Sequence, residues 1–207
     1  MPKRTRPMSE SHNTLNTYGD IRPLIKTGDL IGETGRSIFS WAIRTYNMSE
    51  ISHVGLAQVE GFNGKKRVSI IESLEPHGVS SRAISSMEYF WWVPLDLIPS
   101  HRAEIDNLHF KLKGHMPYSK RGIAIQILKS LPLLGQMVKS SWLDPDRVIC
   151  SQYVARHMKS HFDNVPTAPN PRDMAKWALT SALDKSRSLG PVLVMCPKKT
   201  PVDFGPS

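Results

Sequence analysis

Apolar and polar residues alternate along two neighbouring segments of the chain, Ser52–Val59 and Lys66–Leu74. A period of two residues is typical of a strand that has one face in a protein core. The stretch Glu60–Gly64 contains two glycines and an asparagine, so it predicts a hairpin loop between these strands. Apolar runs over Tyr89–Leu95 and Val192–Cys196 predict two further strands.

Other segments carry apolar residues at the three- and four-residue spacing of a helix. Gly35–Tyr46 is one such segment, and Ser100 is the expected N-cap of another that runs to Lys113. Further helices are predicted from Cys150 onward and over Pro171–Lys185, and a turn with a short strand is predicted over Ile25–Ile31. A small antiparallel sheet packed against these helices would form an α+β domain.

The length of 207 residues suits one well-packed domain. We expect a flexible polar arm over residues 1–20, a single domain over 21–197 and a short tail over 198–207. The first residues carry basic charge without an apolar segment behind them, which argues against a secretory signal peptide. No apolar run approaches the roughly 18 residues of a membrane-spanning helix, so a cytoplasmic or virion-associated protein is expected.

The chain is basic, with 27 Lys and Arg against 18 Asp and Glu and a net charge of +9. Such a charge favours contact with an anionic surface or partner. The sequence contains no Gly-rich phosphate loop, and its two cysteines exclude an ordinary zinc finger, so we expect no specific nucleic-acid partner.

Cys150 is the strongest candidate for chemistry. It follows a polar stretch broken by Pro145 and begins an amphipathic run, which places its thiol at the start of a helix. The positive end of the helix dipole favours a thiolate there, and the unpaired N–H groups of a helix start can stabilise an oxyanion. Ser151, the next residue, is therefore a candidate substrate or oxyanion contact. Cys196 ends an apolar run and is interpreted as a core residue.

A histidine and a carboxylate lie on the two strands of the predicted hairpin. Alternation puts His53 on one face with Gly55, whose small size leaves room beside the ring. Glu72 shares a face with Ile70, and a carboxylate on an apolar face needs a polar partner. An imidazole on the neighbouring strand would be such a partner, and together with Cys150 these residues would form the nucleophile, base and orienting group of an activated thiol.

Several short motifs in this order resemble one family of enzymes. The motifs are Gly28–Ile31, Ser52–Leu56, Ile71–Ser73, Cys150–Val154 and the Pro-led segment Pro169–Ala175. They resemble the circularly permuted papain-fold hydrolases, the permuted branch of the NlpC-type cysteine peptidases and amidases, of the YiiX and YebB kind. The resemblance implies a papain-like fold in which the histidine strand precedes the cysteine helix. It implies Cys150 as nucleophile, His53 as base and Glu72 as the orienting third residue, with no metal or organic cofactor.

The same resemblance extends to a contact residue and to the substrate. Gly114–Tyr118 is similar to the Gly-x-x-Tyr segment of the family, which implies Tyr118 as a substrate or oxyanion contact. The apolar stretch Arg121–Ser141 matches no motif; a lid, a membrane-touching surface and ordinary core all remain open. The resemblance implies a cell-wall peptide as substrate, and a protein amide or a lipid acyl group is open as well.

Two other functions compete with a thiol amidase that works through an acyl-enzyme. Cys150, His157 and His161 are spaced by seven and four residues, so they share one helix face and could bind zinc. A basic binding or virion-structural protein that retains the fold without catalysis is the non-enzymatic alternative. An ester or lipid acyl hydrolase on the same fold is the enzymatic one.

Overall fold

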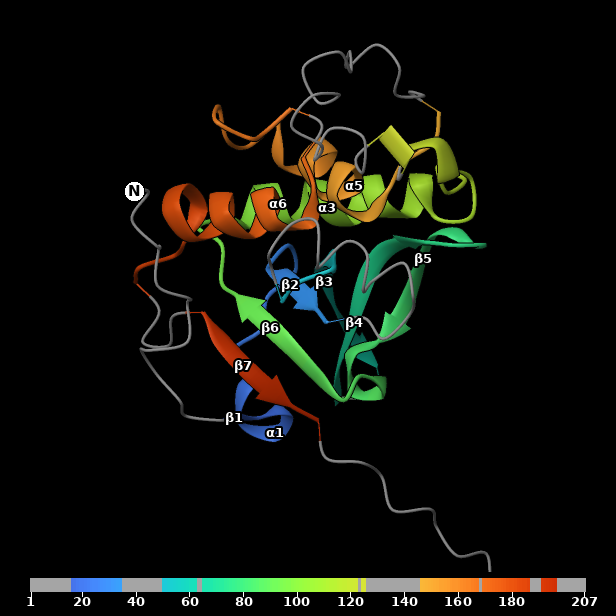
Figure 1. The fold of residues 1–207 in the computed structure, drawn as a ribbon. Coiled ribbons are helices and arrows are strands. Elements are labelled where there is room, and N and C mark those ends of the chain that lie inside the picture. Colours follow the sequence, from blue (N-terminus) through green and yellow to red (C-terminus); the bar gives the residue numbers. More distant parts are fainter. Residues whose placement is uncertain are drawn as a thin grey trace, which may run out of the picture.

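The computed structural model describes residues 16–34, 50–62, 65–122, 124–125, 146–167, 169–186 and 191–196. Within these residues a single seven-stranded sheet is covered on one face by three helices, α3, α5 and α6 (Figure 1). The short β1 and α1 lie at the opposite end of the sheet from these helices (Figure 1). The prediction of an α+β domain is confirmed.

The sheet has the strand order β1-β7-β6-β2-β3-β4-β5. All its pairs are antiparallel except β1 with β7, which is parallel. The predicted hairpin is present in this sheet, since β3 and β4 pair over seven residues on each side. The strands are β1 (Asn16–Thr17), β2 (Leu30–Glu33), β3 (His53–Phe62), β4 (Lys65–Leu74), β5 (Gly78–Ala83), β6 (Tyr89–Val93) and β7 (Val192–Met195).

The helical elements are α1 (Tyr18–Ile21), the 3-10 turn η2 (Ile84–Ser86), α3 (Pro99–Leu112), α5 (Cys150–Met158), α6 (Pro171–Trp177) and the π-helical turn η5 (Ala178–Ala182). Two predicted helix ends are wrong. Helix α3 begins at Pro99 with Ile98 as its N-cap, and not with Ser100, because proline suits the first position, where an N–H would have no partner. The predicted helix to Lys185 ends earlier, since Leu183 pairs with Leu95 beside the sheet.

Some parts of the chain differ from the predictions, and other predicted segments lie outside the described residues. Strand β5 was not predicted, and Asn16–Thr17 form a short strand inside the segment expected to be an arm. The helix predicted over Gly35–Tyr46, residues 1–15, the tail over 198–207 and most of Arg121–Ser141 lie outside the described residues.

The alternation along the central strands sorts their side chains between two cores. Leu30, Leu56 and Ile71 lie opposite one another in register and pack with the helices, including Tyr153 of α5. The other face buries a second cluster around Trp92. Each of these large side chains is buried to 1 % or less exposure, which contributes roughly 1.5–3 kcal/mol apiece. The two cores fix which side chains of β3 and β4 face the start of α5.

Two features of the described residues bear on the competing functions. No helix among them is long and apolar enough to cross a membrane. Within the same residues no three His, Cys, Asp or Glu side chains are grouped as metal ligands. His157 instead bonds to the Tyr153 carbonyl at 2.9 Å, and His161 stacks on His101 with ring centroids 4.3 Å apart.

Candidate active site

Cys150 is the first residue of α5, as predicted from the sequence, and it is 5 % exposed. The chain just before it is held on two sides. Val148 pairs with Tyr118, and its carbonyl accepts a hydrogen bond from the Ser73 hydroxyl at 2.8 Å. Because Ser73 follows Glu72 on β4, this bond ties the start of α5 to the strand that carries the candidate carboxylate.

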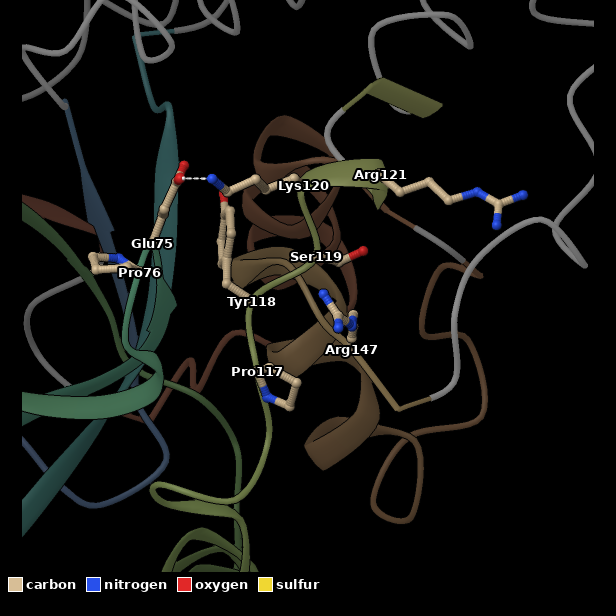
Figure 2. Close-up of a pocket in the computed structure, with 8 residues that line it drawn as sticks. All are labelled: Glu75, Pro76, Pro117, Tyr118, Ser119, Lys120, Arg121 and Arg147. Atoms are coloured by element: carbon tan, nitrogen blue, oxygen red, sulfur yellow. Dashed lines mark ion pairs between the residues drawn. The ribbon is translucent and has the colours of Figure 1, made fainter.

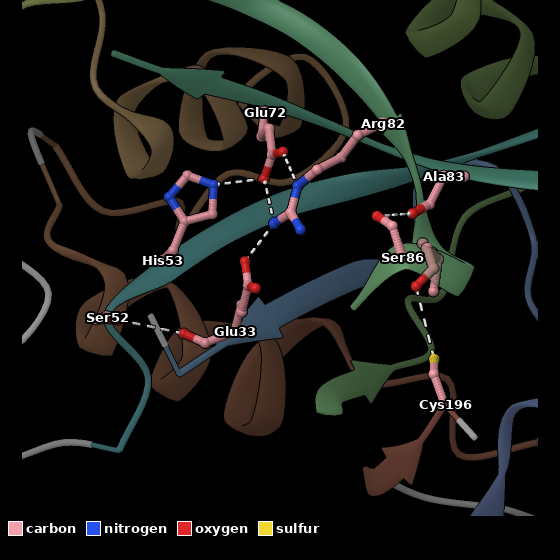
Figure 3. Close-up of polar contacts among 9 residues, drawn as sticks. Glu33, Ser52, His53, Glu72, Arg82, Ala83, Ser86 and Cys196 are labelled. Atoms are coloured by element: carbon pink, nitrogen blue, oxygen red, sulfur yellow. Dashed lines mark hydrogen bonds and ion pairs between the residues drawn. The ribbon is translucent and has the colours of Figure 1, made fainter. Parts of the chain in front are cut away.

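His53 is the first residue of β3, and its Nε2 lies 2.6 Å from Oε2 of Glu72 on β4 (Figure 3). The predicted contact between this histidine and this carboxylate is therefore present. The side chain of His53 also hydrogen-bonds to Cys150, for which Nδ1 is the nitrogen that remains. The structure thus brings Cys150, His53 and Glu72 together, although they lie far apart in the sequence.

The space beside His53 differs from the expectation. Gly55 does not leave an open face, because β4 packs directly against it. A Cβ atom at this position would lie 2.5 Å from the Ile71 carbonyl oxygen and 2.6 Å from Ile70. The glycine therefore serves the close approach of the two strands.

The Glu72 carboxylate is fully buried and holds two cationic or titratable partners. One is His53, and the other is Arg82 of β5, whose Nε donates to Oε1 and whose Nη2 lies 3.3 Å from Oε2. The same guanidinium also pairs with Glu33 at the end of β2 (Figure 3). Four adjacent strands therefore contribute one side chain each to this charged network.

The electrostatics favour a charged thiol and imidazole. Burial raises the pKa of Cys150, but the His53 charge and hydrogen bond, with the backbone N–H groups of Val54 and Ser151, outweigh it and lower this pKa. Burial lowers the pKa of His53, but the adjacent thiolate and Glu72 outweigh it and raise that pKa. The pKa of Glu72 is lowered, because hydrogen bonds and charge from His53 and Arg82 exceed the opposing effect of burial.

The two other predicted site residues are Ser151 and Tyr118. The Ser151 hydroxyl is buried and donates to the Pro169 carbonyl at 2.6 Å, so its side chain fastens α5 to the segment before α6. Its backbone N–H, in contrast, points to the Cys150 sulfur. The pKa of Tyr118 is raised by burial and then by the charges of Cys150 and Glu75, which places this phenol close to the thiol.

Sequence reasoning did not find Arg82 or Glu33. Arg82 lies on the unpredicted strand β5, whose sequence GVSSRA has no apolar alternation. Glu33 was only the end of a short apolar run. Cys196, in contrast, is a buried core residue as predicted, and its thiol donates to the Ile84 carbonyl at 3.6 Å (Figure 3).

A pocket of about 570 Å³ lies beside the start of α5. Its described lining comes from three segments: the turn after β4, the chain from Pro117 onward and the residue three positions before Cys150. The lining residues are Glu75, Pro76, Pro117, Tyr118, Ser119, Lys120, Arg121 and Arg147 (Figure 2). Tyr118 therefore belongs both to this pocket and to the surroundings of the thiol.

No protein-family model matches the chain, and no curated protein matches it. Among solved structures, the chain is similar to the crystal structure of the metalloprotein yiiX from Escherichia coli O157:H7, of family DUF1105. The two share 17% sequence identity, the match covers 68% of each chain, and the TM-score is 0.49.

Proposed function

We propose that this protein is a cysteine hydrolase that cleaves an amide bond through an acyl-enzyme. One observation carries the proposal: a buried Glu72 holds Nε2 of His53 at 2.6 Å while the same imidazole hydrogen-bonds to Cys150 at a helix start. A thiolate, a base and a group that orients the base are the parts that nucleophilic acyl transfer needs.

In the proposed reaction, the Cys150 thiolate attacks the carbonyl carbon of the substrate and forms a C–S bond. The negative charge that develops on the oxygen is stabilised by the backbone N–H of Cys150 at the start of α5. The His53 imidazolium gives its proton to the departing nitrogen, and the amine leaves as the tetrahedral intermediate collapses to a thioester. Neutral His53 then takes a proton from water, the hydroxide attacks the thioester, and the carboxylic acid and the thiol are released.

Glu72 has a supporting part in this scheme. Its carboxylate accepts a hydrogen bond from Nε2 of His53, which directs Nδ1 toward the thiol and stabilises the imidazolium. The order of these residues in the chain, with the histidine strand before the cysteine helix, is the one expected of a circularly permuted papain fold. We include that topology, and a peptide amide such as that of a cell-wall peptide, in the proposal.

Acylation by p-nitrophenyl acetate tests the proposal without knowledge of the natural substrate. We expect a burst of about one p-nitrophenolate per protein and an acetyl group on Cys150, located by mass spectrometry after acid quenching. Cys150→Ala should fold and lose the burst, whereas Cys196→Ala should keep it, because Cys196 is a buried thiol away from the histidine. A Cys150→Ala protein with an undiminished burst would overturn the proposal. A wild-type protein without acylation would favour the non-catalytic binding protein.

A further inference from the structure

Four of the eight histidines of the chain lie where α3 meets α5 and the turn that follows it (Figure 1). His101 of α3 stacks on His161, with ring centroids 4.3 Å apart. His109 of α3 and His157 of α5 both contact Tyr153. Nδ1 of His109 lies 3.3 Å from the Tyr153 hydroxyl, and Nδ1 of His157 lies 2.9 Å from the Tyr153 carbonyl oxygen. The proposed reaction uses none of these imidazoles.

The two inner histidines are buried with one ring nitrogen unsatisfied. His109 and His157 are 0 % and 1 % exposed, and Nε2 of each bonds to nothing among the described residues. Because Nδ1 of His157 faces a carbonyl oxygen, it carries the ring proton, and Nε2 is the unprotonated nitrogen of the neutral ring. A second proton on either ring would create a buried cation with an N–H that has no described acceptor.

The surroundings keep both rings neutral. Burial and then the Lys113 charge lower the pKa of His109 to about 4. Burial also lowers the pKa of His157 to about 4, against the opposing hydrogen bond of the Tyr153 carbonyl. The charges that add to this effect come from His109 of α3, Arg156 of α5 and His161 of the following turn.

The outer pair of histidines brings one carboxylate, but not to the inner rings. Oε2 of Glu104 lies 3.9 Å from Nδ1 of His161, and the Glu104 side chain is 64% exposed. Burial and the His101 charge lower the pKa of His161, which Glu104 opposes. Among the described residues, the charged groups that act on His109 and His157 are therefore all cationic.

The two halves of α3 are held in different ways. Near its start, Arg102 bonds to Asp29 at 3.1 Å and to the Leu95 carbonyl at 2.9 Å, and neither contact involves a histidine. Near its end, the described side-chain hydrogen bonds are that of His109 with Tyr153 and an exposed one from Lys113 to the Ser81 hydroxyl at 3.0 Å. The second half of the helix is thus the part whose packing requires a neutral imidazole.

We propose that His109 and His157 form an acid-sensitive latch, which holds the C-terminal half of α3 against α5 at neutral pH and releases it in acid. In the released state the two rings regain an ordinary pKa of about 6.5, so below that pH the released state binds more protons than the packed state. The effect grows as the pH falls, until the packed rings themselves titrate near 4. The chain beyond α3 leads directly to Tyr118, so release also loosens one wall of the pocket beside α5.

Hydrogen exchange followed by mass spectrometry tests the latch and does not depend on hydrolase activity. After correction for chemical exchange, it gives the opening constant of residues 106–113 across the acid range. In wild type this constant should rise by up to about 100-fold per unit fall in pH, because each of two protons contributes up to tenfold. His109→Asn and His157→Asn keep a polar nitrogen near the position of Nδ1 but cannot be protonated, so each should reduce the rise to about tenfold per unit. His77→Asn, at an exposed histidine, is the matched control and should behave as wild type.

Two results overturn the latch. One is a pH dependence of residues 106–113 that both asparagine variants leave unchanged. The other is a wild-type protein in which β3 opens with the same pH dependence as these residues, because the histidines would then govern the whole fold. If the variants do not fold, NMR titration of the wild-type histidines decides. His109 and His157 should take up their protons at the pH where the end of α3 loses protection, and titration of either ring while α3 stays protected also overturns the proposal.

Discussion

Two buried carboxylates of this protein have similar hydrogen-bond partners, but they differ in whether a described partner can gain or lose a proton near neutral pH. Asp29 and Glu72 are both fully buried, and each pairs with an arginine. Asp29 accepts hydrogen bonds from Arg102 at 3.1 Å and from the Trp92 indole at 2.9 Å. It also accepts from the backbone N–H of Lys26 at 3.0 Å. None of these donors changes its charge near neutral pH.

Glu72 differs because one of its two partners is titratable. His53 lies between this carboxylate and Cys150, so any change in the charge of the carboxylate reaches the thiol through the imidazole. A buried carboxylate with permanent donors, such as those described for Asp29, is a structural anchor, and one that shares its hydrogen bonds with an imidazole can support proton transfer. The comparison therefore predicts that Asp29 governs stability and Glu72 governs reactivity.

The largest expected effect is on stability. Asp29→Ala should lower the free energy of unfolding by about 3–5 kcal/mol, because it removes the carboxylate that neutralises the largely buried Arg102 guanidinium and accepts from the Trp92 indole N–H. Glu72→Ala should cost less, about 1–3 kcal/mol, since Arg82 is 30% exposed and keeps its pair with Glu33. Urea unfolding followed by tryptophan fluorescence measures both. Equal losses in the two variants would break the comparison.

The next effect is on the thiol. His53→Ala should slow iodoacetamide labelling of Cys150 at pH 6 by about 10- to 100-fold. The thiol then returns toward an ordinary pKa near 8.5, so its thiolate fraction at pH 6 falls to well under one per cent. The loss of labelling rate is partly offset, because a more basic thiolate is intrinsically more reactive. Site-resolved mass spectrometry of quenched samples gives the rates, and His77→Ala, an exposed histidine in the turn after β4, is the matched control. Equal rates in wild type and His53→Ala would mean that no thiolate–imidazolium pair forms.

The strands and helices that position this site follow from local patterns. The alternation in β3 and β4 and the polar break before Cys150 are signals within a few residues, and each predicted its element. The predicted helix ends were less accurate. The spacing of apolar residues does not show that α3 begins at Pro99 or that Leu183 pairs with Leu95. Strand β5 is polar and half-exposed, so no apolar alternation marks it.

The candidate site also contains one contact that the sequence could predict and one that it could not. The contact between His53 and Glu72 was predictable, because a carboxylate on an apolar strand needs a partner and the hairpin offered an imidazole. Arg82 was not predictable, since its contact with Glu72 requires β5 to be the neighbour of β4, which is a property of the sheet order. One arginine among many charged residues has no local signature that distinguishes it.

A smaller effect is expected from Glu72→Gln, which keeps the shape of the side chain and removes its charge. The His53 pKa should fall because the imidazolium loses its carboxylate, the Cys150 pKa should rise in turn, and labelling at pH 6 should slow about 3- to 10-fold. The full pH profile of labelling measures the shift. A loss as large as that of His53→Ala would mean that Glu72 also holds the imidazole in place, beyond its charge.

The same variant predicts a pH dependence of stability. The pKa of Glu72 is lowered in the folded protein, so its charge stabilises the fold above its unfolded pKa of about 4.3. That contribution is lost as the pH falls through the lower, folded pKa. The difference in unfolding free energy between wild type and Glu72→Gln should therefore be largest near neutral pH and narrow in acid, as measured by urea unfolding at several pH values. A difference that widens in acid would contradict the assigned direction.

The smallest effect should come from Arg82, which contacts neither the thiol nor the imidazole and acts through Glu72 as a positioning residue. Arg82→Gln should slow Cys150 labelling at pH 6 about 2- to 5-fold and move its pH profile upward, and Arg82→Lys should restore part of the loss because it keeps the charge. If the arginine acts only through the carboxylate, the double variant with Glu72→Gln should label no more slowly than Glu72→Gln alone. Additive losses would instead show that Arg82 influences the thiol by a route independent of Glu72. The difference in reactivity between the Glu72 and Asp29 sites could then not be assigned to the carboxylate and its imidazole alone.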